Sequence, residues 1–106
     1  MRIEYNKLIR DRIPEIIQAD GRTCGTETLS EGEYRKVLFQ KLVEEAQEAA
    51  ESSSDGLVTE LADVLEIVDA IMTAYSIHHQ SVLTEQEQRR TQRGGFDKRL
   101  RLLWTE

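Results

Sequence analysis

The sequence predicts an all-α protein, and three observations support this fold class. Two long stretches repeat apolar residues every three or four positions, which is the spacing of amphipathic helices. Capping boxes mark helix starts near Ser30 and Thr84. A chain of 106 residues suits one domain with a thin core, because a domain of this size buries roughly two-thirds of its unfolded surface. We therefore expect a helical bundle of two long antiparallel helices plus shorter ones, completed by oligomerisation.

Composition excludes several classes of protein. Acidic residues outnumber basic ones 20 to 14, a formal net charge of −6, whereas nonspecific nucleic-acid binding needs a basic surface. No apolar run is long enough for a transmembrane helix, and the first residues lack the apolar stretch of a signal peptide. The single cysteine, Cys24, cannot form an internal disulfide. These features predict a cytoplasmic protein that binds neither a nucleic-acid polymer nor a membrane.

The N-terminal part predicts one short helix followed by a connection. Pro14 fits the first turn of a helix, and Gly21 can end it. Residues 22–29 contain three threonines and one glycine, so this segment is expected to be a loop or a short strand.

Two long helices follow. The first begins after Ser30, with Glu33 completing the capping box, and its apolar positions are Tyr34, Val37, Leu38, Leu42, Ala46 and Ala49. The second covers about residues 56–77 and is apolar over a broad part of its circumference. Such a helix packs against more than one neighbour, which places it at the centre of a bundle.

The C-terminal part predicts a third helix and a tail. The helix is expected from Thr84 to Arg93, because Thr84 opens a second capping box and Gly94 offers a stop. Polar and apolar residues then alternate in the tail, which is compatible with a strand. A two-stranded ribbon of residues 23–29 and 96–103 is therefore an additional expectation.

Closely spaced acids on the two long helices predict a metal site. Residues three apart on a helix are neighbours, and two antiparallel helices can bring two such pairs together. All-oxygen, highly charged sites suit hard cations such as Mg²⁺. The acids concerned are Glu44, Glu45 and Glu48 on the first helix and Glu60 and Asp63 on the second.

The helical wheel separates Glu45 from an ordinary solvated acid. At about 100° per residue, Glu45 falls inside the apolar stripe, whereas Glu48 and Lys41 lie at its edge and Glu44 lies further out. A buried carboxylate needs a cationic partner. That partner could be a metal ion, but also Lys41 or an arginine of another helix, and Glu-rich helix faces are usually only solvated.

Three ordered motifs resemble one family along nearly the whole chain. Glu44-Glu45-Ala46-Gln47-Glu48 followed by Glu60-Leu61-Ala62-Asp63 resembles the EExxE…ExxD signature of the all-α nucleoside triphosphate pyrophosphohydrolases. The opening segment, residues 5–17, and the closing Arg93-Gly94-Gly95-Phe96 resemble the MazG-like, phosphoribosyl-ATP pyrophosphohydrolase-like house-cleaning branch of that superfamily. The resemblance implies a single domain over residues 1–106 and a homodimer or tetramer.

The resemblance also implies residue roles. The Mg²⁺ ligands, which could also hold Mn²⁺, would be Glu45, Glu48, Glu60 and Asp63, with Glu44 as a further catalytic acid. Basic and aromatic residues would bind the nucleoside triphosphate, and the candidates are Lys7, Arg10, Lys41, Arg93, Phe96 and Lys98. The implied reaction converts the triphosphate and water into a monophosphate and pyrophosphate. The alternatives are hydrolysis of phosphoribosyl-ATP and a non-catalytic helical interaction protein.

Overall fold

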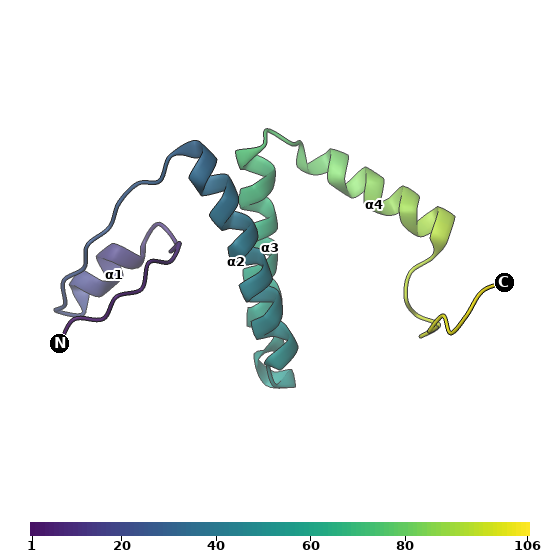
Figure 1. Cartoon of the computed structure of the whole chain (residues 1–106), viewed down its shortest axis with the longest axis horizontal. Helices are drawn as coiled ribbons and strands as arrows, with labels where there is room; N and C mark the ends of the chain where they lie inside the picture. Colours follow the sequence, from purple (N-terminus) through teal and green to yellow (C-terminus); the bar gives the residue numbers. More distant parts are fainter.

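The computed structural model covers residues 1–106 and confirms the all-α class. A central antiparallel hairpin of two long helices carries a short helix on one side and a separate helix on the other (Figure 1). The elements are α1 (Ile13–Ala19), α2 (Glu31–Glu51), the 3₁₀ turn η1 (Ser54–Gly56), α3 (Leu57–Ala74) and α4 (His79–Arg93). None of these helices combines the length and the apolar character needed to cross a bilayer.

The predicted ribbon of residues 23–29 and 96–103 is wrong, because the structure contains no strand. Both segments are almost wholly exposed, residues 96–99 form a turn closed by the N–H of Arg99 on the carbonyl of Phe96, and the two segments lie on opposite sides of the hairpin (Figure 1). An isolated two-stranded ribbon is marginal in water, and here nothing would cover its apolar face.

The start of α2 and the end of α1 agree with the sequence-based expectation. The Ser30 hydroxyl accepts a hydrogen bond from the backbone N–H of Glu33 at 3.3 Å, which caps α2. Gly21 follows α1 with a φ of +79°, and the N–H of Arg22 donates to the carbonyl of Ile17. This is the Schellman geometry, in which a glycine in the left-handed region ends the helix.

The predicted boundaries of the last two helices need correction. Helix α3 ends at Ala74, and α4 begins at His79 rather than Thr84. Thr84 lies inside α4, where its hydroxyl accepts a hydrogen bond from the Gln80 amide at 3.3 Å. The capping-box pattern at Thr84 is therefore accidental, because the helix reaches back past it to His78 as the N-cap.

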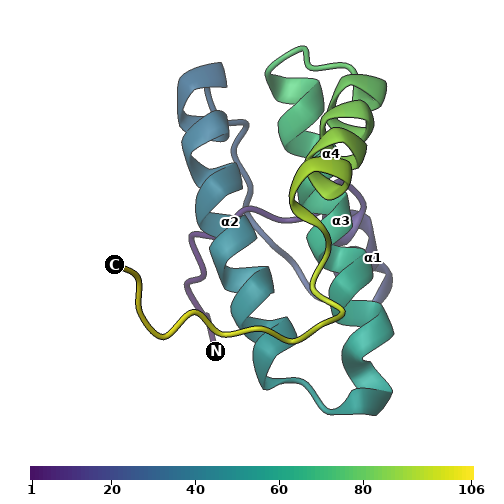
Figure 2. The ribbon, with the colours of Figure 1, turned by 90° about the vertical axis from the view of Figure 1, so that its right-hand side faces the viewer.

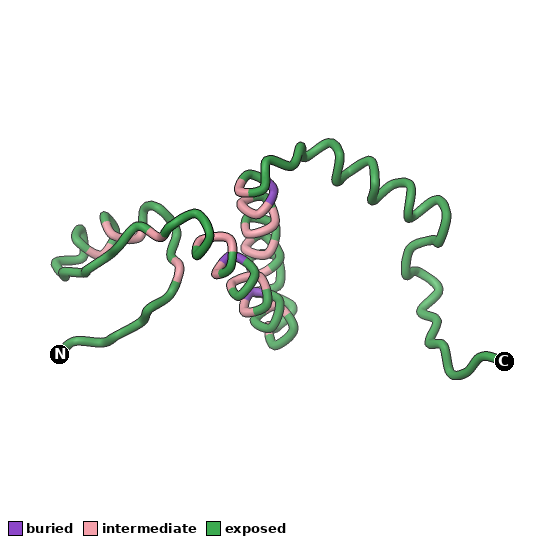
Figure 3. The backbone as a smooth tube through the Cα atoms, turned by 45° about the horizontal axis from the view of Figure 1, so that its top comes forward, coloured by how far each residue is buried: buried purple, intermediate pink, exposed green.

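The core of the single chain is confined to the hairpin (Figure 3). Only Leu38 of α2 and Met72 of α3 are buried apolar residues, and Glu45 is the third buried residue. Other apolar residues of α3 remain exposed, among them Val58, Leu61 and Leu65, because α2 is the only long helix packed against α3. Within one chain, α3 therefore packs against one long helix, whereas its apolar pattern predicts more than one helical neighbour.

Arg35 joins the N-terminal half of α2 to the C-terminal end of α3. Its guanidinium lies 4.6 Å from the ring centroid of Tyr75, donates to the carbonyl of Ala74 at 2.9 Å and pairs with Glu31 at 2.8 Å. The carbonyl of Ala74 belongs to the last turn of α3, where carbonyls lack helical partners. Arg35 therefore satisfies this helix end and closes the open end of the hairpin.

We expect Arg35→Ala to lower the free energy of unfolding by about 1–2 kcal/mol, because it removes a cation–π contact and hydrogen bonds to a half-buried carbonyl. Urea denaturation followed by circular dichroism measures this change. The matched control is Lys36→Ala, at an exposed neighbouring position without an ion pair. An equal loss in both variants would contradict the role of Arg35.

Candidate metal centre

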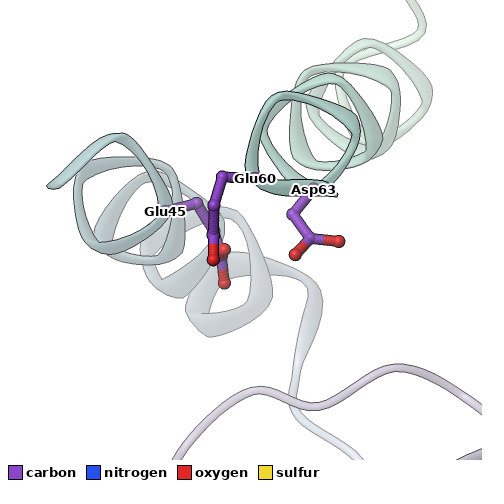
Figure 4. A group of neighbouring side chains, drawn as sticks. All are labelled: Glu45, Glu60 and Asp63. Carbon is purple, nitrogen blue, oxygen red and sulfur yellow. The ribbon is translucent and has the colours of Figure 1, made fainter. Parts of the chain in front are cut away.

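Three carboxylates from the two hairpin helices converge in the half of the hairpin nearer the α2–α3 turn. One oxygen each of Glu45, Glu60 and Asp63 lies within 4.8 Å of the other two. Glu45 comes from α2, and Glu60 and Asp63 come from neighbouring positions of α3, with all three side chains turned to the same side (Figure 4). The predicted convergence of acids from the two long helices is therefore confirmed for these three residues.

Glu45 occupies the buried position that the helical wheel predicts. It is only 8% exposed, whereas the neighbouring Ala46 is exposed. Its Oε2 and the Oε2 of Glu60 are buried without a hydrogen-bond partner. Buried polar atoms are normally satisfied, and a buried carboxylate oxygen without a partner costs several kcal/mol in an apolar setting. A cation that binds these two oxygens would remove this cost.

Basic side chains surround the three carboxylates. Lys41 lies 3.4 Å from Glu45 on the same helix, which confirms the ion pair considered from the sequence. Lys7 pairs with Glu44 at 3.1 Å, and Arg10 donates to Asp63 at 2.7 Å. The N-terminal segment therefore brings two positive charges to the acids of the hairpin, across large distances in sequence.

The charges around the site shift three pKa values. The hydrogen bond with Glu44, followed by the charge attraction to the same residue, raises the pKa of Lys7. The same hydrogen bond and the charge of Lys41 lower the pKa of Glu44. The negative charge of Glu45 raises the pKa of Glu48, with partial desolvation and the charge of Glu60 adding to the effect. The protonation of Glu48 is therefore coupled to the charges of Glu45 on the same helix and Glu60 on the other helix of the hairpin.

We expect the carboxyl carbon of Glu48 to titrate above the usual glutamate range in ¹³C NMR without divalent metal, and Glu45→Gln to move it back down. A raised pKa means that the folded chain binds this proton more tightly than the unfolded chain. The contribution of Glu48 to stability is therefore present at low pH and is lost as the pH rises through the raised pKa. An unchanged titration in Glu45→Gln would contradict the coupling.

Some of the predicted site residues lie outside this cluster. Glu48 is exposed and does not belong to the three converging acids, although its pKa places it within their electrostatic reach. Glu44 faces Lys7 instead. Arg93, Phe96 and Lys98 lie on α4 and the tail, fully exposed and without any ion pair or hydrogen bond from their side chains. The structure of one chain does not bring these three residues to the carboxylates.

The donor set fits a hard divalent cation. All donors are carboxylate oxygens, which Mg²⁺, Mn²⁺ and Ca²⁺ prefer over nitrogen or sulfur. Two oxygens bound to one Mg²⁺ at 2.0–2.1 Å lie at most about 4.2 Å apart. The three oxygens of Glu45, Glu60 and Asp63, all within 4.8 Å of one another, are close to that limit. Small side-chain rotations suffice to hold an ion.

Comparisons with known proteins show one limited similarity. No family model and no solved structure matches the chain. An uncharacterized protein of Mycolicibacterium smegmatis (strain ATCC 700084 / mc(2)155) is 55% identical over 42 residues, which cover 40% of this chain and 43% of that protein. The match thus spans less than half the length of that relative. The fold and the site define an α-helical hairpin protein with a three-carboxylate cluster, and the family resemblance rests on the motifs of this chain.

Proposed function

We propose that the protein is a Mg²⁺-dependent nucleoside triphosphate pyrophosphohydrolase, which cleaves a nucleoside triphosphate or noncanonical deoxynucleoside triphosphate to the monophosphate and pyrophosphate in a house-cleaning role. The observation that carries the proposal is the convergence of Glu45, Glu60 and Asp63, with two buried oxygens lacking partners. Lys41 pairs with Oε1 of Glu45, so the Oε2 atoms of Glu45 and Glu60 are left for another partner. Motif order adds support, because the acids lie where the EExxE…ExxD signature would place metal ligands.

In this proposal the acidic residues of the hairpin bind the metal ion and orient a neighbouring lysine. Glu45, Glu60 and Asp63 would hold Mg²⁺, with Glu48 completing the set at the edge of the cluster and Glu44 orienting Lys7. When bound, the metal lowers the pKa of a coordinated water and offsets negative charge on the phosphates. Neither histidine lies in the cluster, so in this proposal a carboxylate would accept the proton from the attacking water.

Lys7, Arg10 and Lys41 would meet the negative charge of the triphosphate. Each already lies within 4 Å of one of the acids. The planar guanidinium of Arg10 can bind two phosphate oxygens at once, and a triphosphate carries more negative charge than the half-exposed carboxylate of Asp63. Metal at Asp63 and phosphate at Arg10 would thus replace one ion pair by two stronger interactions.

A nucleotide panel tests the proposal. The protein is incubated with Mg²⁺ and each common or oxidised nucleoside triphosphate, and with phosphoribosyl-ATP, and both pyrophosphate and monophosphate are measured. Equimolar release of the two products from a nucleoside triphosphate supports the proposal. Release only from phosphoribosyl-ATP would instead support the histidine-pathway alternative. Orthophosphate as the first product would indicate cleavage at the γ-phosphorus and would contradict the proposed reaction.

A non-catalytic helical interaction protein is the second candidate. It is favoured by the full solvent exposure of α4 and the tail. Residues 75–106 are all exposed, which is typical of a segment that binds another protein. This candidate predicts no product with any nucleotide and no effect of Glu45→Gln on partner binding.

A further inference from the structure

The N-terminal segment, defined as residues 1–22, lies across both helices of the hairpin. In Figure 2 it crosses behind α2 and α3, on the side of the hairpin away from α4. Lys7 contacts α2 through Glu44, and Arg10 contacts α3 through Asp63. Asp63 is one of the three converging acids. The N-terminal segment is thus attached to the hairpin at the candidate metal centre itself.

Two ion pairs are the only polar contacts between the N-terminal segment and the hairpin. No backbone hydrogen bond joins residues 1–29 to α2 or α3, and α1 has no buried residue. Leu8 is the only half-buried residue before α1. The side chains of Arg10 and Asp63 are 59% and 34% exposed, and exposed ion pairs contribute little to stability. A competing cation can therefore break this attachment.

The connection to α2 allows the N-terminal segment to move. Residues 23–29 make no backbone hydrogen bond, and all of them except Leu29 are exposed. A connection of seven residues spans up to about 25 Å when it is extended. Because α1 is held by its own backbone hydrogen bonds, the segment can leave the hairpin without unfolding a helix.

Arg10 and a bound metal ion would share one carboxylate. The guanidinium donates to Oδ1 of Asp63 at 2.7 Å, and a Mg²⁺ ion lies about 2.0–2.1 Å from its oxygen ligands. Two cations bound to the same carboxylate would thus be only about 5–6 Å apart, and like charges at this distance repel each other. Each of them therefore weakens the binding of the other.

Lys7 is subject to the same competition at longer range. Its pKa is raised first by the hydrogen bond and the charge of Glu44, and further by the charges of Glu48 and Glu45. These additional charges show that the acids of α2 attract Lys7 beyond its direct partner. A divalent ion on Glu45 would offset part of this attraction. Both attachments of the N-terminal segment are therefore weakened by the same event.

We propose that the N-terminal segment is a latch that competes with a divalent cation for the carboxylate cluster. In the metal-free chain, Lys7 and Arg10 hold the segment across the hairpin. Arg10 leaves Asp63 when a cation occupies the cluster, and the segment then separates from the hairpin and uncovers the site. The latch rests on the metal centre of the proposed function and adds an order of events, in which the cation binds before the substrate enters.

Manganese binding measures the competition without any assay of activity. The electron paramagnetic resonance signal of free Mn²⁺ gives the dissociation constant of the wild type and of Arg10→Ala. Loss of the competing guanidinium is expected to tighten Mn²⁺ binding about two- to fivefold, which corresponds to the strength of an exposed ion pair. Equal or weaker binding in Arg10→Ala would overturn the latch, because weaker binding would mean that Arg10 positions Asp63 for the ion.

The matched control is Arg12→Ala, which removes the same charge from the same segment. Arg12 pairs with Glu15 inside the segment and has no partner in the hairpin. Its dissociation constant for Mn²⁺ is therefore expected to equal that of the wild type. Equal tightening in Arg10→Ala and Arg12→Ala would show a general effect of net charge and would overturn the competition at Asp63.

A spin label measures the release of the N-terminal segment. A nitroxide on a cysteine replacing the exposed Asp11, in a Cys24→Ser background, is attached to ¹⁵N-labelled chains. These chains are diluted into an excess of unlabelled chains, so that broadening arises within one chain. Amide signals of α3 around Asp63 are expected to broaden without metal and to recover at saturating Mg²⁺. A nitroxide at Glu51, an exposed residue of α2, should broaden its neighbours equally in both conditions.

The outcomes distinguish failure of the latch from failure of the proposed function. Absence of broadening without metal, or broadening that persists at saturating Mg²⁺, would overturn the latch. Equal recovery in sodium chloride of the same ionic strength would also overturn it, because this salt only screens charge. Absence of Mn²⁺ binding in every variant would overturn the release together with the metal centre. A chain that binds Mn²⁺ and releases the segment, but forms no pyrophosphate from any nucleotide, would contradict the proposed reaction alone.

Discussion

Glu45→Gln is expected to lower the rate of Mg²⁺-dependent pyrophosphate release at least about 100-fold. Glu45 is the most buried of the three converging acids, and its Oε2 has no partner within the chain. The amide keeps the shape of the side chain but removes the negative charge that a hard cation requires. Initial rates at saturating Mg²⁺, with the best substrate of the nucleotide panel, measure the effect.

The matched control is Glu51→Gln, which changes an exposed glutamate of the same helix that has no ion pair. We expect its rate to stay within about twofold of the wild type, since exposed substitutions away from a site perturb little. Circular dichroism must show equal helix content in both variants. Retention of most of the activity in Glu45→Gln would remove this acid from the site and contradict the proposed metal centre.

The hairpin could be predicted from the sequence because its determinants are local. The capping serine, Ser30, and the three-and-four spacing of apolar residues depend only on neighbours along one helix. The same periodicity singles out Glu45, because an acid within an apolar stripe is inconsistent with a solvated helix face. The pairing of α2 with α3 then follows from the short turn between them.

The rest of the site depends on contacts that no local pattern encodes. Arg10 reaches Asp63 across 53 positions of sequence, and its basic character alone does not identify this partner. The Schellman cap at Ser76 sets the direction of α4, but a serine with a positive φ has no reliable sequence signal. The alternating tail matched a strand, although nothing pairs with it in the chain. No sequence pattern singles out Arg35, because its main partner is a backbone carbonyl.

Millimolar Mg²⁺ is expected to raise the melting temperature of the protein, independently of any substrate. The folded hairpin brings Glu45, Glu60 and Asp63 together, whereas the unfolded chain disperses them. An ion that binds only the folded state stabilises it by about 2.7 kcal/mol at 100 times its dissociation constant. For a domain of this length, that free energy corresponds to a shift of roughly 10 °C or more. Differential scanning fluorimetry with and without a chelator measures it.

Glu60→Gln separates a bound ion from simple screening of charge. Removing one of three converging negative charges lessens their repulsion, so the metal-free variant is expected to melt at or above the wild-type temperature. Its response to Mg²⁺ should be largely lost, because the oxygen ligands of the cluster fall from three charged groups to two. Glu66→Gln, at an exposed position of the same helix, should keep the full response. Sodium chloride at equal ionic strength screens surface charges without occupying the cluster. An equal shift with sodium chloride would therefore identify the three acids as a screened patch that holds no ion.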